Sequence, residues 1–338
     1  MRIGSCVAII ATAAVAAGCG GSAGSASRRP FGPNSPWNAP LARSAPVDPR
    51  SPTMVTDLIR QIAQYGVWIN TTSYSVPIYT VRKGQKPVHI HLDIPGRDHA
   101  WNNPMFTNLL DGAVLQRQLD AVPVPPNARG AGGTDHSLVV WQPSTDTAWE
   151  LWEARDLPRD PLRWPDPTPG WHAMWGARVD HVSTSSGVIP APFGATASGL
   201  SLLGGLIRIH ELEAGHIDHA IAIGIPQPTG GRFVPPATRT DGRHPEMPVP
   251  EGTRFRLDPR LDVNALHLPP VAKMIALAAQ RYGLIVRDTA GSVVVFAEDP
   301  TPTGSNPYPR LFGGLSPGQI MIRFPWSRLQ VIAPGKAA

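Results

Sequence analysis

The sequence predicts a β-dominated α+β fold, in which two antiparallel sheets pack as a jelly-roll-like sandwich with two peripheral helices. Proline and glycine occur 39 and 33 times in 338 residues and are spread along the chain, which favours many turns between short elements. About a dozen short runs have the composition or alternation of strands, whereas only two segments have helical spacing. Helices do not alternate with the strands, so a parallel Rossmann sheet or barrel is not expected.

The two expected helices lie far apart in the chain. The first covers 53–65, where Met54 and Leu58 begin an apolar stripe at helical spacing and Gly66 ends it. The second covers 269–282, with proline in its first turn and glycine directly after its end.

Short strands are expected between and after these helices. They are 67–70, 76–81, 88–92, 137–141, 149–152, 217–225, 284–287, 292–296, 320–324 and 329–332, with a strand pair or extended edge over 171–182. Two hairpins are expected, one across the turn 142–147 and one across 288–291.

The composition excludes several classes of protein. Hydrophobic residues make up 42% of the chain, which excludes wholesale disorder, and two cysteines exclude a disulfide-stapled scaffold. The formal net charge of +5 is dispersed, which argues against nucleic-acid binding. The glycine-rich loop 130–133 lacks the spacing of a phosphate cradle, so no nucleotide is expected to bind, and no cofactor is implied.

The N-terminus indicates export. Residues 1–18 read as a signal peptide, with Arg2 ahead of a short apolar run. The tetrad that ends at Cys19 resembles a bacterial lipobox, which implies a diacylated cysteine, often with an additional fatty acid such as palmitate on its amino group. Residues 19–29 then form the lipidated cysteine with a flexible tether, and 30–338 a single β-rich globular domain on the extracytoplasmic face of the cell membrane. The alternative is an ordinary signal peptide that is cut nearby.

Six blocks carry a further resemblance. They are 31–41, 135–140, 194–212, 215–223, 250–259 and 278–292. Together they resemble a broad group of uncharacterised secreted bacterial proteins, common in actinobacteria, over about residues 31–332. The resemblance implies a single exported domain and draws attention to His136, Glu150, Asp180, Glu211, Gly215 and His219.

The densest polar cluster runs from His210 to His219. Its two leading histidines, His210 and His216, are six residues apart with Gly215 between them, so the four-residue spacing of a zinc-protease helix is absent. Glu211 precedes the turn, and His219 lies in an apolar strand, where it is either a core histidine or a general acid or base at the floor of a cleft.

Further catalytic candidates lie elsewhere in the chain. His136 opens a strand beside the glycine-rich loop, and Asp180 ends another. For a hydrolase, Glu211 with Asp180 or Glu150 is the expected carboxyl pair; for a lyase, His136 or His219 is the expected base.

Substrate-binding candidates rest on the ten tryptophans. Glu150 and Trp152 share a strand face, and Trp171 adds a second aromatic group, as a sugar-binding cleft requires; the alternative is that tryptophan fills the core. Arg239 lies in a polar loop, where it is expected either to clamp an anionic substrate or to be part of a solvated loop. His89 and His91 face one way on a strand and are weak metal candidates, so no metal is assigned.

The sequence therefore predicts a lipid-anchored exported protein that cleaves glycans, as a hydrolase or a lyase, with Glu, Asp and His side chains in a tryptophan-lined cleft. Two alternatives stay open: a non-catalytic envelope module that binds glycan or protein, and a metal-binding lipoprotein.

Overall fold

The computed structural model describes residues 29–93, 109–158 and 168–334. Its helices are α1 (Ser51–Tyr65), α2 (Leu109–Leu119), α3 (Ile209–Ala214), α4 (Pro270–Arg281), α5 (Tyr308–Leu311) and α6 (Pro317–Met321). Its strands are β1 (Val67–Asn70), β2 (Ile78–Thr80), β3 (Ile90–Leu92), β4 (Leu138–Gln142), β5 (Thr147–Trp152), β6 (Arg155–Leu157), β7 (Gly170–Ala173), β8 (Trp175–Asp180), β9 (Ile221–Ile225), β10 (Arg254–Leu257), β11 (Leu284–Thr289), β12 (Val293–Phe296) and β13 (Leu329–Val331).

The strands form three sheets, each with both parallel and antiparallel pairs. Their orders are β1-β12-β9-β11-β10-β13, β2-β4-β5-β8 and β3-β7-β6. The expectation of a β-dominated α/β mixture is confirmed, but the two-sheet antiparallel jelly roll with two helices is not what the chain forms. The parallel pairs β1 with β12 and β2 with β4 join segments far apart in sequence, and no local pattern specifies such pairings.

The six-stranded sheet is covered on both faces. Along β9, Ile221 and Ile223 face a core shared with α1, α4 and α6, whereas Ala222 faces a second core. The second core includes Val139 of β4, so the four-stranded sheet packs against the large sheet there. Burial on both faces explains why β9 reads as a continuous apolar run.

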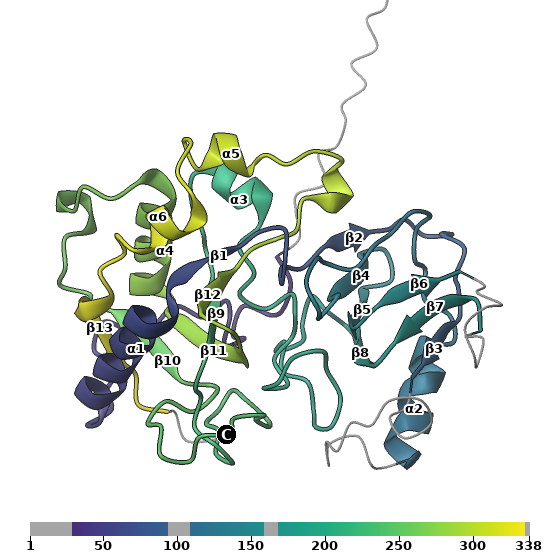
Figure 1. Ribbon diagram of the computed structural model, residues 1–338, viewed down its shortest axis with the longest axis horizontal. Coiled ribbons are helices and arrows are strands. Elements are labelled where there is room, and N and C mark those ends of the chain that lie inside the picture. Colours follow the sequence, from purple (N-terminus) through teal and green to yellow (C-terminus); the bar gives the residue numbers. More distant parts are fainter. Residues whose placement is uncertain (1–28, 94–108, 159–167, 335–338) are drawn as a thin grey trace, which may run out of the picture.

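The four-stranded sheet also has two buried faces. Val140 and Leu151 point into a third core, which contains Leu115 of α2 and Ile90 of the three-stranded sheet. Figure 1 shows the resulting two lobes, one with the large sheet and α1, α4 and α6, the other with the two smaller sheets and α2.

The segment that precedes α1 is anchored rather than merely wrapped over the surface. Trp37 is 1% exposed and packs in the second core, and its carbonyl accepts a hydrogen bond from the backbone N–H of Ala220 at 2.7 Å. The side-chain amide of Asn38 donates to the carbonyl of Pro30 at 2.8 Å. These contacts fix the start of the domain against the turn that leads into β9.

Several local expectations are confirmed and three are wrong, among them the strand expected over 217–225, which begins only at Ile221 and leaves His219 in the turn before it. The expected helices match α1 and α4, and the hairpin across 142–147 matches the β4–β5 pair. The hairpin across 288–291 does not form, because β9 lies between β11 and β12. The apolar run at 320–324 does not form a strand. Its first two residues are the end of helix α6, which Ser316 caps at its start.

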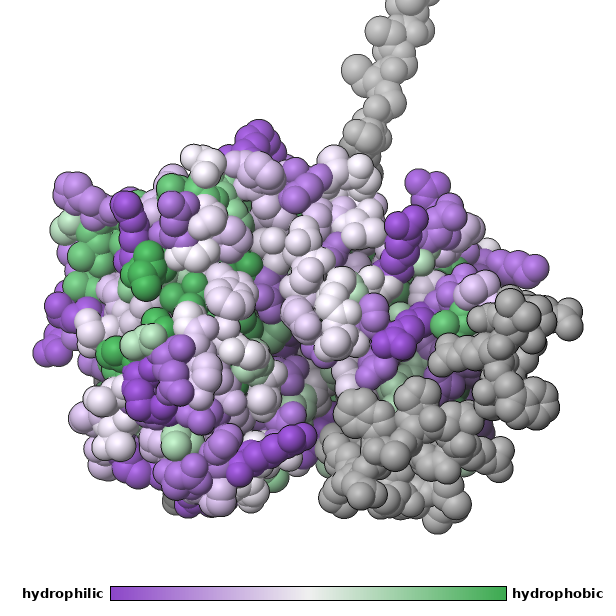
Figure 2. Space-filling view, in the orientation of Figure 1, coloured by the Kyte–Doolittle hydropathy of each residue, from purple (hydrophilic) through white to green (hydrophobic). Residues whose placement is uncertain are grey.

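In the part of the chain that the structure describes, no helix has the length and apolar character needed to cross a bilayer. On the face shown in Figure 2, polar side chains are spread over both lobes, and apolar ones gather over the lobe that carries α1, α4 and α6.

Candidate functional site

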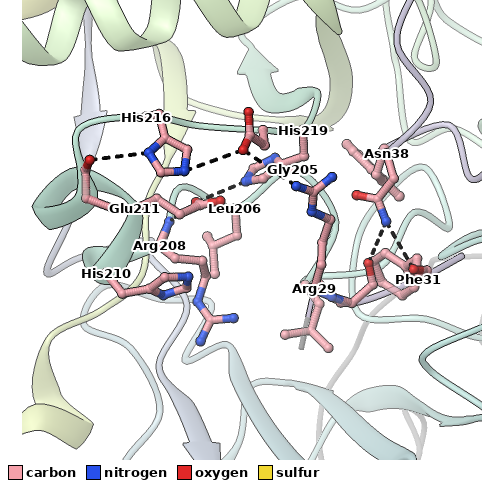
Figure 3. A pocket seen from close by; sticks show the side chains of 15 residues that line it. Arg29, Phe31, Asn38, Gly205, Leu206, Arg208, His210, Glu211, His216 and His219 are labelled. Carbon is pink, nitrogen blue, oxygen red and sulfur yellow. Dashed lines mark hydrogen bonds and ion pairs between the residues drawn. The ribbon is translucent and has the colours of Figure 1, made fainter. Parts of the chain in front are cut away.

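A polar pocket lies beside α3, with a cavity volume of about 140 Å³. Its walls come from the segment 29–38, from 203–208, from α3 and from the turn 214–219 that follows this helix. Figure 3 shows the side chains of these segments converging on one space. Two of the expected catalytic residues, Glu211 and His219, line it.

The short helix α3 places Glu211 at the pocket. The backbone N–H of Arg208 donates to Glu211 Oε2 at 2.9 Å, which is the reciprocal half of a capping box at the start of the helix. Gly215 ends the helix with φ 82°, a left-handed conformation that glycine adopts without strain. The chain can then turn back, so that His219 meets the helix it has just left.

Glu211 and His219 form a buried hydrogen-bonded pair. The distance from His219 Nε2 to Glu211 Oε2 is 3.0 Å, and that from His219 Nδ1 to the carbonyl oxygen of Ala220 is 2.8 Å. A carbonyl oxygen only accepts, so Nδ1 carries a proton. Nε2 faces a carboxylate, so it donates as well, and the ring is an imidazolium.

The two partners shift each other's pKa in opposite directions. Burial opposes the charge of His219, but the charge of Glu211 and its hydrogen bond outweigh burial and raise the His219 pKa above 6.5. Burial alone would raise the Glu211 pKa, but the imidazolium and the Arg208 N–H lower it below 4.5. The pair is therefore ionic near neutral pH.

The remaining charges of the pocket are also paired. Arg208 Nε lies 2.9 Å from Glu298 Oε2, and both side chains are largely buried. Arg29 lies 3.7 Å from Asp218 in a more exposed pair, and His216 Nε2 lies 3.4 Å from the same carboxylate. Of the two arginines, Arg29 has the longer and more exposed contact with its carboxylate. Its guanidinium can therefore exchange that carboxylate for a ligand more easily than Arg208 can.

His210 differs from the other histidines of the pocket. Partial burial, followed by the charge of Arg208, lowers its pKa below 6.5, so the ring is neutral at pH 7. Figure 3 shows His210 and Arg208 on one wall and Arg29 on another. From the sequence, His210 was considered only within a zinc-protease motif whose spacing is absent, and it was assigned no role.

A close packing contact shapes the pocket wall. Gly205 lines the pocket with φ 67°, and a Cβ there would collide with the ring of Trp37 and the backbone nitrogen of Ala222. Only glycine allows this approach, so the double glycine at 204–205 sets the pocket against the second core.

The other expected catalytic residues lie outside this pocket. His136 has φ 39°, and its Nδ1 lies 3.1 Å from the carbonyl of Ala131, so it closes the glycine-rich loop. Asp180 lies exposed at the end of β8, 2.9 Å from Arg178 Nε. Neither lines the pocket that contains Glu211.

Two expected substrate-binding residues are enclosed. Glu150 is 0% exposed, and its carboxylate accepts from the Ser201 hydroxyl and, at 2.8 Å, from the backbone N–H of Leu202. Arg239 is buried and donates to main-chain carbonyls of the segment 193–197. Both side chains hold loops between the lobes, and they are not presented to a substrate.

The two tryptophans expected to bind substrate differ in their exposure. Trp171 is 8% exposed and belongs to the third core, whereas Trp152 is partly exposed and adjoins Asp135. Trp101 and the lipid-attachment candidate Cys19 lie outside the described residues.

The two weak metal candidates belong to a histidine group. His89 Nδ1 lies 3.3 Å from Asp120, and the ring of His91 lies 4.9 Å from that of His172. His172 is held by Asp93 at 2.8 Å. Within the described ranges, no three His, Cys, Asp or Glu side chains come together in a way that could hold a metal ion.

Sequence reasoning missed a group of four acids, Asp135, Asp241, Glu251 and Asp288. Burial and then the charge of Asp241 raise the pKa of Asp288 to about 7. Burial, with Asp241 and Asp288, raises the pKa of Glu251 well above its usual 4.5. The available signal was Asp288, which lies close behind the apolar run 284–286.

Comparisons of the chain with protein-family models, with curated proteins and with solved structures found no match. The geometry of the pocket is therefore the basis for assigning a function.

Proposed function

We propose that the protein is a lipid-anchored enzyme on the extracytoplasmic face of the membrane, and that it cleaves acidic polysaccharides by β-elimination in the pocket beside α3. The observation that carries this proposal is that His210, Arg208 and Arg29 line one pocket, and the lowered pKa of His210 supports it. The lipid anchor rests on the lipobox-like sequence that ends at Cys19.

Elimination from a uronate requires two groups that the pocket can supply. A cation neutralises the C6 carboxylate, which acidifies the proton on C5, and a neutral base removes that proton. The C5–H electron pair forms the C4=C5 double bond while the C4–O bond breaks, and the leaving oxygen takes a proton. Arg29 is suited to the first role, because a substrate carboxylate can replace its exposed contact with Asp218. His210 is suited to the second.

The Glu211–His219 pair is assigned a positioning role. Both ring nitrogens of His219 are engaged, so this ring is not the base, although the sequence had suggested it. The pair holds the start of α3 against the turn that follows this helix. His210 lies in the same helix, directly before Glu211.

Elimination is supported better than hydrolysis. A glycoside hydrolase requires one protonated carboxyl group as a general acid. The pKa of Glu211 is lowered, so its carboxyl group is ionised at neutral pH and unsuited to that role.

The test is the ultraviolet absorbance of the C4=C5 double bond when residues 28–338 are mixed with a panel of polyuronates. We expect the wild type to generate absorbing oligosaccharides, and His210→Gln to lower kcat by about 100-fold or more with little change in KM. The matched control is His267→Gln, since His267 is an exposed histidine distant in sequence that does not line the pocket. Product formation at an unchanged rate in His210→Gln would refute the assigned base, and absence of any product would refute elimination.

A second function, glycan binding without catalysis, is favoured by one observation. Glu211, Arg208 and Asp218 of the pocket each already have an oppositely charged neighbour. A binding module would retain polyuronate in a co-sedimentation assay, generate no product and be insensitive to His210→Gln.

A further inference from the structure

A second and larger recess lies on another part of the molecule. It has a volume of about 860 Å³ and shares no lining residue with the pocket beside α3. Prolines and aliphatic side chains supply most of its walls, among them Pro36, Leu41, Val188, Val234 and Pro236, and Arg254 lies among them. We call this recess the Arg254 groove. Its volume is that of an ordinary small-molecule site.

Arg254 is the first residue of β10, and its backbone is fixed. Its carbonyl accepts from the N–H of Ile332 at 2.9 Å, and its guanidinium donates to the carbonyl of Pro36. The side chain therefore crosses from the sheet edge to the N-terminal segment, with apolar walls around it.

The charge of Arg254 is not compensated. Burial lowers its pKa to about 10, and no acid among the described residues is found to offset that effect. At neutral pH the guanidinium is still a cation, now partly removed from water. A partly buried cation without a counter-ion is unfavourable, so an anion that reached it would be bound favourably.

The other buried arginines of this lobe provide an internal comparison. Arg239 has Asp288 and two further acids nearby, Arg287 has Asp288 and Glu150, and Arg256 has Asp258. Each of these three arginines thus has at least one carboxylate nearby. Arg254 differs from them, and it lies at the wall of the larger of the two recesses.

The other charges of the groove leave it positive. Asp48 also lines it, but its carboxylate is held by Arg50, whose guanidinium lies 3.2 Å away, and this pair is neutral as a unit. The groove therefore offers one net positive charge within an apolar surface.

We infer that the Arg254 groove binds a small organic anion with an apolar body, a carboxylate or sulfonate whose charged end meets Arg254 and whose apolar part lies along the proline-rich walls. The rigid prolines lose no side-chain entropy on binding, which favours an apolar occupant. A sugar acid does not fit this description, because its body would leave hydroxyl groups against apolar walls. This site is separate from the proposed enzymatic activity and does not depend on it.

The experiment titrates residues 28–338 with the fluorescent probe 1-anilinonaphthalene-8-sulfonate under native conditions. We expect saturable binding, displacement of the probe by decanoate, and no displacement by glucuronate. Arg254→Met should weaken binding by about tenfold or more, since a charge-assisted contact is lost, and should leave the affinity for uncharged N-phenyl-1-naphthylamine within about twofold. The matched control, Arg50→Met, removes a groove arginine that is already paired and should change the affinity for the sulfonate much less.

Three results would overturn the inference: no saturable binding by the native protein, equal affinity in Arg254→Met, or equal loss of the charged and uncharged probes in that variant. If Arg254→Met does not fold, Val234→Trp replaces it. This substitution fills the groove while leaving Arg254 in the sequence, and it should abolish binding of both probes. Binding that survives in Val234→Trp would place the probe elsewhere.

Discussion

The pocket beside α3 and the acid group at the end of β11 both gather ionisable side chains that are at least partly buried, but they combine them in opposite ways. In the pocket, Glu211 faces the imidazolium of His219, and each partner's pKa moves so that both stay ionised. In the acid group, Asp288 faces Asp241 and Asp135, and its pKa rises so that it holds its proton. Burial opposes ionisation in both regions, but opposite charges outweigh it in the pocket, whereas like charges add to it in the acid group.

The largest effect is expected from Glu211→Ala. This substitution leaves His219 buried without a counter-ion and removes the acceptor for the Arg208 N–H, so we expect a loss of about 3 kcal/mol in the free energy of unfolding. Glu211→Gln is the matched control, because its amide oxygen can replace Oε2, which faces both the Arg208 N–H and His219 Nε2, while the negative charge is removed. It should cost about 1 kcal/mol.

The cost of Glu211→Ala should depend on pH. The contribution of Glu211 is present above about pH 4.5 and is lost as the pH falls through its lowered pKa. The contribution of His219 is present below about pH 6.5 and is lost as the pH rises through its raised pKa. Urea denaturation should therefore show the greatest difference between wild type and variant near pH 5.5. A difference that is constant from pH 4 to pH 9 would mean that the pair is not ionic.

A smaller effect of opposite sign is expected from Asp288→Asn. The unfolded carboxyl group loses its proton near pH 3.8, whereas the folded one keeps it to about pH 7, so wild-type stability falls as the pH rises across this interval. Asparagine cannot ionise and still accepts from the Ala197 N–H, which lies 3.1 Å from Asp288 Oδ1. We expect the variant to gain about 2 kcal/mol at pH 8 and almost nothing at pH 4.

Chemical denaturation at these two pH values tests that expectation. Asp262→Asn is the control, since Asp262 caps a short helical turn and its bond to the Asn264 N–H is exposed. A stability gain of equal size at both pH values would show that the effect of Asp288→Asn is unrelated to its charge.

Local patterns specified much of the secondary structure and little of its assembly. The apolar stripe of α1 and its stop at Gly66 could be predicted, because both depend on neighbours in the sequence. The position of β9 between β11 and β12 could not, because it depends on which faces are buried by distant segments. Ile320 was assigned to a strand for a different reason, because the capping box that Ser316 begins is a local signal for a helix and was overlooked.

The site residues were also predictable only in part. Glu211, Gly215 and His219 were identified as a turn flanked by ionisable groups, and the structure brings the two charged residues together. Glu150 and Arg239 were interpreted as substrate contacts, but polar side chains also serve to tie buried loops, and sequence does not distinguish the two uses.

The smallest effect is expected from Asp180→Asn, and it distinguishes the two proposed chemistries. Asp180 forms an exposed pair with Arg178, with side chains 52% and 43% exposed, so its loss should change stability by no more than about 0.5 kcal/mol. If cleavage is an elimination in the pocket beside α3, product formation by Asp180→Asn should equal that of the wild type. A hydrolase that used Glu211 with Asp180 would instead lose nearly all activity. Because the substitution hardly affects folding, a large fall in kcat would have to be chemical, and it would move the active site to a cleft between Glu211 and the end of β8.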